Sequence, residues 1–240
     1  MTPRRARDDR GARKLNQAWG EVRAFLASAC NTQMASVVGS IATNSIHITM
    51  NTSNHSRLPS DLPKPVDDGA ARHLEGLHLP SVILASSDGT SIDLGSLKGR
   101  WVIYVYPMTG RPGAPLPDGW NDVPGARGCT SQSCSFRDHH KELLGLDVGV
   151  LGLSAQASDE QCEAKDRLHL PFELLCDASL KLKQALRLPT FAIDGIELYK
   201  RLTFITEDDR ISKVFYPVFP PDRNADEVLS WLHNNTTRSA

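Results

Sequence analysis

Cysteine is scarce in this sequence, and long apolar runs are absent. Five cysteines in 240 residues are too few for the disulfide scaffold of a small secreted domain, and no secretory signal is visible. A reducing, cytoplasmic setting is therefore expected. No stretch approaches the ~18 consecutive apolar residues of a membrane span, and a formal net charge of −1 gives no overall field to attract nucleic acid. The hydrophobic share of 40% still predicts a sizeable core.

The first quarter of the chain differs from the rest in charge and composition. Residues 1–58 carry eight basic residues against three acidic ones, and residues 31–56 contain no formal charge. Apolar residues at helical spacing predict one amphipathic helix over residues 15–28. A basic start followed by such a helix is also typical of a mitochondrial transit peptide, although the acidic residues argue against that interpretation. We expect residues 1–58 to be a largely disordered extension and residues 59–78, rich in proline at their start, to be a linker.

The most continuous β-forming run is Trp101–Tyr106, which reads WVIYVY. Six consecutive apolar or aromatic residues predict a strand buried on both faces, as in a central sheet, and Pro107 ends it. Shorter β-rich runs predict further strands, and capping patterns predict helices. The expected strands are Val82–Ala85, Ser91–Leu94, Asp147–Ser154, Tyr199–Thr206 and Ile211–Tyr216, and the expected helices are Ser158–Leu168, Ser179–Leu186 and a closing helix from Asn224.

Two cysteines share one short stretch, Pro124–Asp138, which reads PGARGCTSQSCSFRD. Gly128 precedes the first of them, Cys129, and helix-compatible residues follow it, so the sequence predicts a turn that delivers Cys129 into the first turn of a helix. The free N–H groups and partial positive charge of a helix N-terminus favour a thiolate over a thiol, and the thiolate is the reactive form of cysteine. The cysteines outside this stretch are interpreted as incidental or as small apolar residues; they are Cys30, Cys162 and Cys176.

The stretch resembles the active-site helix of peroxiredoxins. The shared string is Gly-Cys-Thr, a second cysteine at Cys134 and then Phe-Arg-Asp, and it is most similar to the atypical two-cysteine, bacterioferritin-comigratory type. The resemblance implies an α/β, thioredoxin-like fold over residues 79–235, with a central mixed β-sheet flanked by helices. It also implies that Cys129 is the peroxidatic cysteine and Cys134 the resolving one. Arg201 matches the arginine that the family places beside the peroxidatic cysteine.

The residues before Cys129 depart from the family pattern Pro-x-x-x-Thr-x-x-Cys. Pro107 lies twenty-two residues before the cysteine instead of seven, and position 126 is alanine where the family has threonine. The family's threonine hydrogen-bonds the thiolate and the peroxide, so Thr109 and Thr130 are the two candidates for that role, with Thr109 preferred. The resulting insert, residues 110–127, is rich in proline and glycine. It is expected to be either a wall or lid over the cysteine or a surface loop.

The resemblance implies a thiol-dependent peroxidase that reduces hydrogen peroxide or organic hydroperoxides in antioxidant defence. Cys129 would become a sulfenic acid, and Arg201 would stabilise the charge that leaves on oxygen. Cys134 would then form a disulfide, which thioredoxin or a glutaredoxin-type reductant would reduce by exchange. No cofactor, metal, nucleic acid or membrane partner is expected, and the sequence is compatible with a monomer or a homodimer.

The spacing of the two cysteines predicts a movement. Five residues along an ideal helix are ~7.5 Å apart in rise and roughly 140° apart in angle, whereas a disulfide needs Cα atoms within ~4.4–6.8 Å. A bond between Cys129 and Cys134 therefore requires the first turns of that helix to unwind.

Three other interpretations compete with the peroxidase. A thioredoxin-type dithiol–disulfide oxidoreductase would carry Cys-x-x-Cys, whereas this chain has four residues between its cysteines. A thioredoxin-like module that senses oxidation without turnover would fit the altered threonine position and the insert. A metal site built from Cys129, Cys134, His139 and His140 is disfavoured, because the cysteine spacing is wrong for common zinc pairs and adjacent histidines point apart on a helix.

Overall fold

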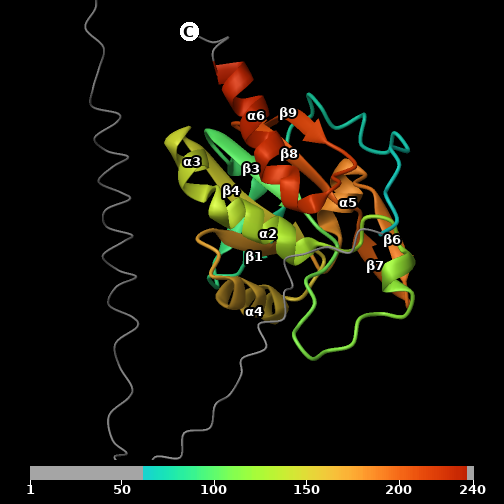
Figure 1. Ribbon diagram of the computed structural model, residues 1–240. Coiled ribbons are helices and arrows are strands. Elements are labelled where there is room, and N and C mark those ends of the chain that lie inside the picture. The colour runs from blue at the N-terminus through green and yellow to red at the C-terminus, as the bar shows by residue number, and fades with distance from the viewer. Residues whose placement is uncertain (1–61, 237–240) are drawn as a thin grey trace, which may run out of the picture. The chain divides into compact units, whose positions relative to one another are not determined.

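A seven-stranded mixed β-sheet lies at the centre of the structure, a computed structural model that describes residues 62–236 (Figure 1). The strand order is β2-β1-β5-β4-β3-β8-β9. Strands β3, β4 and β5 are parallel to one another, and the other pairings are antiparallel. The strands are β1 (Ile83–Ser86), β2 (Ser91–Asp93), β3 (Arg100–Val105), β4 (Val148–Ser154), β5 (Glu173–Cys176), β8 (Leu202–Glu207) and β9 (Arg210–Phe215).

Helices cover both faces of this sheet, which confirms the predicted thioredoxin-like arrangement. The helices α2, α3, α4 and α6 pack on one face, and α5 packs on the other (Figure 1). Short 3-10 turns and a two-stranded hairpin complete the chain. The helices are α2 (Cys129–Asp138), α3 (His140–Gly145), α4 (Ser158–Leu168), α5 (Lys181–Leu186) and α6 (Asn224–Thr236), the turns are η1 (Leu94–Ser96), η2 (Trp120–Asp122) and η3 (Pro221–Arg223), and the hairpin strands are β6 (Thr190–Ile193) and β7 (Ile196–Tyr199).

Strand β3 is the buried central strand that its apolar run predicts. Val102 and Tyr104 point into the core beneath α2, whereas Ile103 and Val105 point into the core on the opposite face, and none of the four is exposed. Because β3 pairs with β4 on one side and β8 on the other, both of its edges are hydrogen-bonded. The end of this strand is therefore a rigid platform for the residues that follow it.

Two helix starts differ in detail from their predicted caps. The helix expected at Ser158–Leu168 is α4, but its cap uses Glu160, whose carboxylate accepts a hydrogen bond from the Ala157 N–H at 3.0 Å. The helix expected from Ser179 begins two residues later, at Lys181. Asp177 accepts hydrogen bonds from the first two N–H groups of that helix, at 2.8 and 2.9 Å. An aspartate that binds the first N–H groups in this way caps the helix.

The folded part begins before Leu79, the residue at which the sequence predicted it to start. Ala71 and Leu74, in the expected linker, are buried in the core beside α5. The backbone of Gly76 also donates to the Ile211 carbonyl of β9 at 2.8 Å. Proline breaks the sequence pattern of this segment and predicts a linker, whereas burial of its apolar side chains and its backbone bond to β9 attach it to the sheet. The expected extension 1–58, with its helix at 15–28, lies outside the described residues.

The insert and the hairpin share a small apolar cluster of their own, which we call the insert cluster. It contains Trp120 and Ala126 from the insert and Ile193 and Leu198 from the hairpin, and the Trp120 ring lies 6.2 Å from that of Phe191. The second half of the insert is thus anchored by packing, whereas residues 111–115 are exposed.

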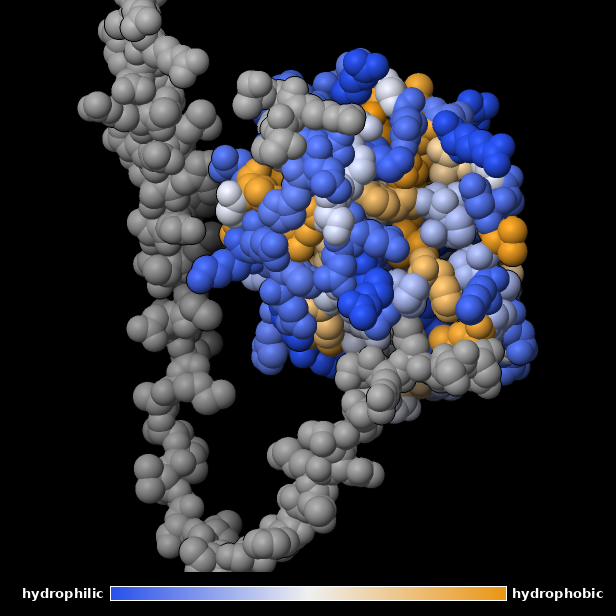
Figure 2. Space-filling model, turned by 45° about the horizontal axis from the view of Figure 1, so that its top comes forward, coloured by the Kyte–Doolittle hydropathy of each residue, from blue (hydrophilic) through white to orange (hydrophobic). Residues whose placement is uncertain are grey.

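The surface carries scattered apolar side chains rather than one large apolar face. Figure 2 shows one side of the molecule, on which hydrophilic and hydrophobic residues are interspersed. The exposed large apolar residues come from separate elements and include Val66, Ile83, Leu144 and Ile196. In the part of the chain that the structure describes, no helix is both long and apolar enough to cross a membrane.

Candidate active site

Cys129 is the first residue of α2, as its sequence context predicts. The preceding Gly128 has φ 96°, a left-handed backbone conformation that glycine adopts without the strain of a side chain. This turn brings the chain from the insert into the helix. Cys129 is 3% exposed and lies in the first turn of the helix, whose free N–H groups favour negative charge nearby.

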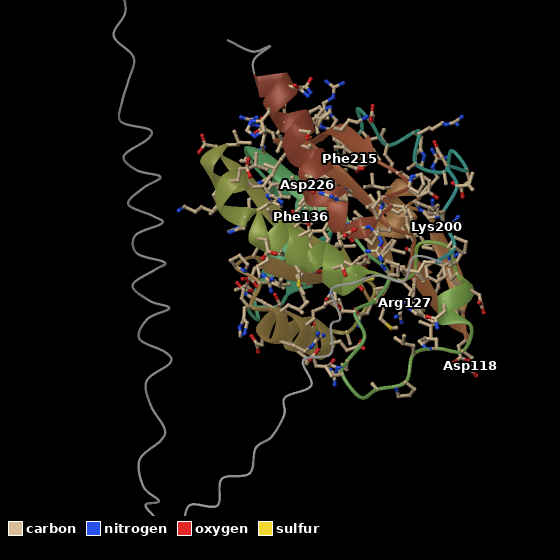
Figure 3. The ribbon with its side chains drawn as sticks, in the orientation of Figure 1. Asp118, Arg127, Phe136, Lys200, Phe215 and Asp226 are labelled. Atoms are coloured by element: carbon tan, nitrogen blue, oxygen red, sulfur yellow. The ribbon has the colours of Figure 1, made fainter. Side chains whose placement is uncertain are left out.

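Arg201 lies directly against this sulfur. The residue precedes β8 and is 3% exposed, and its Nη2 is 3.1 Å from Cys129 Sγ. The same nitrogen donates to a cradle of backbone carbonyls just before α2, those of Gly125, Ala126 and Arg127, at 3.1–3.3 Å. Figure 3 marks Arg127 at the start of α2 and Lys200, the neighbour of Arg201. A buried guanidinium at this distance stabilises a thiolate and any oxygen anion that forms beside it.

The thiol itself has one backbone partner. Cys129 Sγ lies 3.6 Å from the Ala126 carbonyl, so a neutral thiol donates a weak hydrogen bond there. Ala126 occupies the position where the family pattern has threonine, and its side chain is buried in the insert cluster. A methyl group provides no hydroxyl for a thiolate or a peroxide.

Neither candidate threonine makes a hydrogen bond with the sulfur in the described structure. Thr109 is buried, and both its N–H and its hydroxyl donate to Gln156 Oε1, at 2.7 and 3.1 Å. Gln156 Nε2 donates back to the Thr109 carbonyl at 3.1 Å. These bonds anchor the start of the insert to the end of β4. Thr130 is half-buried at the second position of α2.

Three polar residues around Arg201 were not singled out from the sequence as site residues. Gln132 accepts a hydrogen bond from Arg201 Nη1 and donates to Asn224 Oδ1 at 2.9 Å. Thr203 donates to the same Asn224 oxygen at 2.6 Å. Gln132 had one available signal, since it lies three residues after Cys129 and therefore on the same side of the helix.

Cys134 lies farther along α2 and is half-buried against the core beneath the helix. Since α2 is helical from Cys129 to Asp138, the two cysteines are too far apart and too differently directed for a disulfide in this conformation. Burial raises the pKa of the Cys134 thiol above its usual value, although the charge of nearby Arg137 opposes this effect. The described structure is therefore a reduced form in which Cys134 is a neutral thiol.

Aromatic contacts hold the middle of α2 on the sheet. Tyr104 of β3 donates a hydrogen bond to Ser133 at 3.1 Å, and its ring stacks on Phe136 at 4.7 Å between centroids. Burial raises the pKa of Tyr104 far above its usual range, so the phenol stays protonated and remains a donor. Gly152 of β4 makes room for this ring, because a Cβ there would lie 2.7 Å from the Tyr104 hydroxyl.

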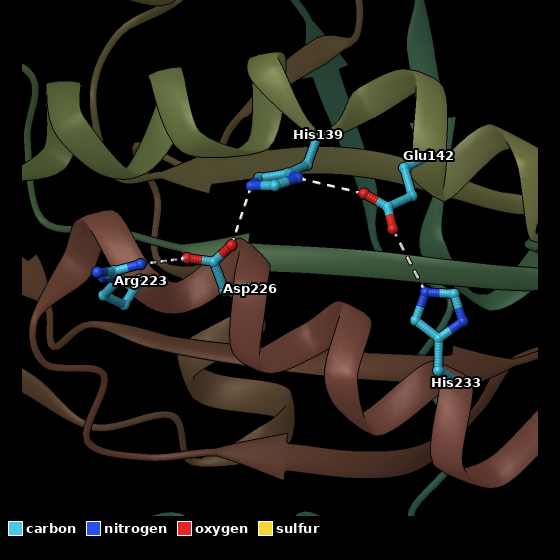
Figure 4. A network of polar contacts seen from close by, with 5 residues as sticks. All are labelled: His139, Glu142, Arg223, Asp226 and His233. Atoms are coloured by element: carbon cyan, nitrogen blue, oxygen red, sulfur yellow. Dashed lines mark hydrogen bonds and ion pairs between the residues drawn. The ribbon is translucent and has the colours of Figure 1, made fainter.

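Charged side chains join the far end of α2 to α6 (Figure 4). His139 caps α2 and contacts Asp226 at 3.0 Å and Glu142 at 3.4 Å. His233 reaches the other oxygen of Glu142 at 3.4 Å, and Arg223 pairs with Asp226 at 3.3 Å. These groups are partly exposed, so each pair contributes little to stability. Across residues 62–236, no group of three or more His, Cys, Asp or Glu side chains is arranged to hold a metal ion.

The sequence pattern of one protein family, Redoxin, matches residues 74–229. The chain belongs to the Redoxin family. Two of its sequence relatives are peroxiredoxins. The chloroplastic peroxiredoxin Q of Suaeda salsa is 26% identical over 166 residues, which cover 68% of this chain and 70% of that protein. The peroxiredoxin bcp1 of Schizosaccharomyces pombe is 35% identical over 124 residues, covering 50% of this chain and 55% of its own.

Solved structures agree on the fold. Peroxidoxin BcpB of Mycobacterium tuberculosis superposes with a TM-score of 0.55 at 24% identity, over 67% of this chain and 97% of that one. A mutant of PrxQ from Xylella fastidiosa gives a TM-score of 0.55 at 20% identity, over 68% and 96% of the two chains. These likenesses confirm the thioredoxin-like fold. The family match and the sequence relatives, which are peroxiredoxins of the Q and Bcp kinds, support thiol-dependent peroxide reduction as the activity.

Proposed function

We propose that Cys129 is the peroxidatic nucleophile of this peroxiredoxin and that Arg201 stabilises both its thiolate and the departing oxygen. The observation that carries the assignment is the distance of 3.1 Å between Arg201 Nη2 and Cys129 Sγ. Cys129 is the only cysteine of residues 62–236 that lies against a buried cation at a helix N-terminus. Helix dipole and guanidinium act in the same direction, because both favour negative charge at the sulfur.

The first chemical step is a displacement on oxygen. The Cys129 thiolate attacks one peroxide oxygen, the O–O bond breaks, and the second oxygen leaves as hydroxide or alkoxide and takes a proton. Sulfur loses two electrons and becomes a sulfenic acid, while the peroxide is reduced to water or an alcohol. Since negative charge moves from sulfur to the leaving oxygen, a single cation beside both atoms stabilises the whole path.

The second step assigns Cys134 as the resolving residue. Its thiolate attacks the Cys129 sulfur, the S–O bond breaks, the oxygen leaves as hydroxide and takes up a proton to become water, and an S–S bond forms. Because the intact α2 keeps the cysteines apart, its first turns unwind before this bond forms. That opening breaks the contacts that Cys129 and Gln132, both in these turns, make with Arg201, so the oxidised site differs in shape from the reduced one.

An external dithiol closes the cycle. Peroxiredoxins act with thioredoxin-like reductants, and we propose thioredoxin or a glutaredoxin-type protein here, because an exposed disulfide in an unwound segment is open to attack. A reducing intracellular compartment, the cytoplasm in the simplest case, supplies such dithiols. Monomer and homodimer are both compatible with this cycle, because both cysteines come from one chain.

Trapping of the sulfenic acid tests this assignment. We expect one equivalent of hydrogen peroxide, added to Cys134→Ser in the presence of dimedone, to label the peptide that contains Cys129. Mass spectrometry locates the label, and Cys129→Ser is the matched control that should carry none. A label on Cys162 or Cys176 instead would overturn the assignment, and no label on any cysteine would favour a module without peroxide chemistry.

The pKa of Cys134 predicts how the second step depends on pH. Burial raises this pKa in the folded helix, so the folded helix is favoured while the Cys134 thiol is protonated. This stabilisation is fully present below the usual cysteine pKa of about 8.5. It is lost as the pH rises through the raised pKa of the folded form. Alkaline pH therefore favours both the opening of the helix and the attacking thiolate.

We expect disulfide formation after a pulse of peroxide to keep accelerating above pH of about 8.5. Acid-quenched samples analysed by mass spectrometry give the rate, and an unfolding concentration of urea supplies the reference for an exposed Cys134. If the rate of disulfide formation in the folded protein levelled off at a lower pH than the rate in urea, the result would contradict a buried resolving thiol.

A further inference from the structure

Asn224 stands at the end of a buried hydrogen-bond chain that begins at Arg201. Arg201 Nη1 donates to Gln132 Oε1, Gln132 Nε2 donates to Asn224 Oδ1 at 2.9 Å, and Thr203 donates to that same oxygen at 2.6 Å. Gln132, Thr203 and Asn224 have no solvent exposure. These hydrogen bonds thereby connect α2, β8 and the first residue of α6 beneath the site. Gln132 and Asn224 are ninety-two residues apart in the sequence.

The direction of every bond in this chain is set by Arg201. A guanidinium has donors and no acceptor, so Gln132 must present its oxygen to Arg201 and its NH₂ to the other side. Asn224 must then present an oxygen to that NH₂. The Thr203 hydroxyl donates to the same oxygen and holds it in place. Only an acceptor at position 224 is compatible with Arg201 in its observed position.

The rest of the Asn224 side chain argues against a purely structural role. Its Nδ2 is buried and has no hydrogen-bond partner among the described residues. A buried donor without a partner destabilises a fold, and a well-packed apolar side chain at such a place is often at least as stabilising. The asparagine is therefore explained by what its oxygen does for Gln132.

We propose that Asn224 is a positioning residue, which holds Arg201 against Cys129 through Gln132. This inference rests on the proposed role of Arg201. It also gives α6 a part in the reaction, since the N-terminus of that helix fixes the orientation of the guanidinium. When the first turns of α2 open, the Gln132–Asn224 bond breaks and Arg201 loses its support. The thiolate is therefore stabilised only while the helix is intact.

The test is the second-order rate constant with which hydrogen peroxide oxidises Cys129 in the full chain, followed by stopped flow. Asn224→Ala is expected to slow this step roughly tenfold, the effect of one good hydrogen bond. Asn224→Asp keeps the acceptor and should restore most of the rate. Asn235→Ala is the matched control, because Asn235 also lies in α6 and donates a hydrogen bond to the Trp231 carbonyl at 2.8 Å; it should react like the wild type.

A double mutant separates positioning from general stability. If Asn224 acts through Arg201, then Asn224→Ala should add little to the loss already caused by Arg201→Met. An equal slowing in both backgrounds, or an Asn224→Ala rate like that of the wild type, overturns the inference while leaving fast oxidation of wild-type Cys129 intact. If Asn224→Ala fails to fold, Thr203→Val serves in its place, because it removes the hydroxyl that donates to Asn224 at nearly constant shape. Thr203→Val should slow oxidation in the protein that retains Arg201 and not in Arg201→Met. Slow oxidation of the wild type itself would instead overturn the proposed function.

Discussion

Cys129→Ser is expected to lower peroxide consumption on the order of 10³-fold or more, because the described residues offer no second thiolate against Arg201. A serine hydroxyl stays protonated at neutral pH and does not displace oxygen from a peroxide. The helix N-terminus and the guanidinium would remain in place, so the loss isolates the nucleophile. The measurement is NADPH oxidation coupled through thioredoxin reductase and thioredoxin, with hydrogen peroxide as substrate.

Two further cysteine variants make this result specific. Cys134→Ser should lose steady turnover with thioredoxin but still consume a burst of one peroxide per chain, since Cys129 is oxidised once and then not resolved. Cys162→Ser should behave as the wild type. Cys162 belongs to α4, and its sulfur contacts the Ser87 carbonyl at 3.3 Å instead of Arg201. Full turnover in Cys129→Ser would move the chemistry to another cysteine, and steady turnover in Cys134→Ser would assign resolution to an outside thiol.

The parts of the site that the sequence predicted are those with a local signal. The central strand follows from the uninterrupted run Trp101–Tyr106, which begins one residue after the observed start of β3. The helix start follows from Gly128 and Cys129, because a turn and a helix are specified by neighbouring residues. Arg201 was found through the family resemblance, and the structure places its Nη2 3.1 Å from Cys129 Sγ.

The missed parts depend on contacts between residues far apart in the chain. Gln132 and Asn224 are polar residues within helices, and nothing in their local sequence tells a buried partner from water. Thr109 illustrates the same limit, since its hydroxyl donates to Gln156, a residue forty-seven positions further along the chain. The linker assignment underestimated Ala71 and Leu74, because a short apolar pair in a proline-broken segment has no periodicity to reveal its burial.

The insert, although absent from the family pattern, is part of the surroundings of Arg201. Residues 110–127 interrupt the family pattern between the central strand and the cysteine, yet the last of them form the carbonyl cradle of Arg201. Trp120 and Ala126 pack on the β6–β7 hairpin, which ends two residues before Arg201. The insert contacts Arg201 through its carbonyls, and the hairpin that packs on the insert leads into Arg201 along the sequence. These contacts favour the interpretation of the insert as a wall beside the cysteine over that of an unattached loop.

Arg201→Met should slow the oxidation of Cys129 by about 10²–10³-fold, the usual cost of removing one preorganised donor from a developing oxyanion. Methionine fills similar space but has no charge and no donor. Three backbone carbonyls and Gln132 would lose their partner as well. Stopped-flow measurement of the second-order rate constant with hydrogen peroxide gives the effect, and circular dichroism checks that the fold is kept.

Arg201→Lys distinguishes charge from geometry. A lysine carries one compact ammonium, which is unable to bond the sulfur, the carbonyl cradle and Gln132 at once, whereas the planar guanidinium serves all of them. Its rate should therefore lie between those of the wild type and Arg201→Met. Arg223→Met is the matched control, because that side chain is 70% exposed and pairs with Asp226, away from Cys129; it should oxidise at the wild-type rate. If Arg201→Met oxidised as fast as this control, the helix N-terminus alone would activate Cys129, and the 3.1 Å contact would be structural.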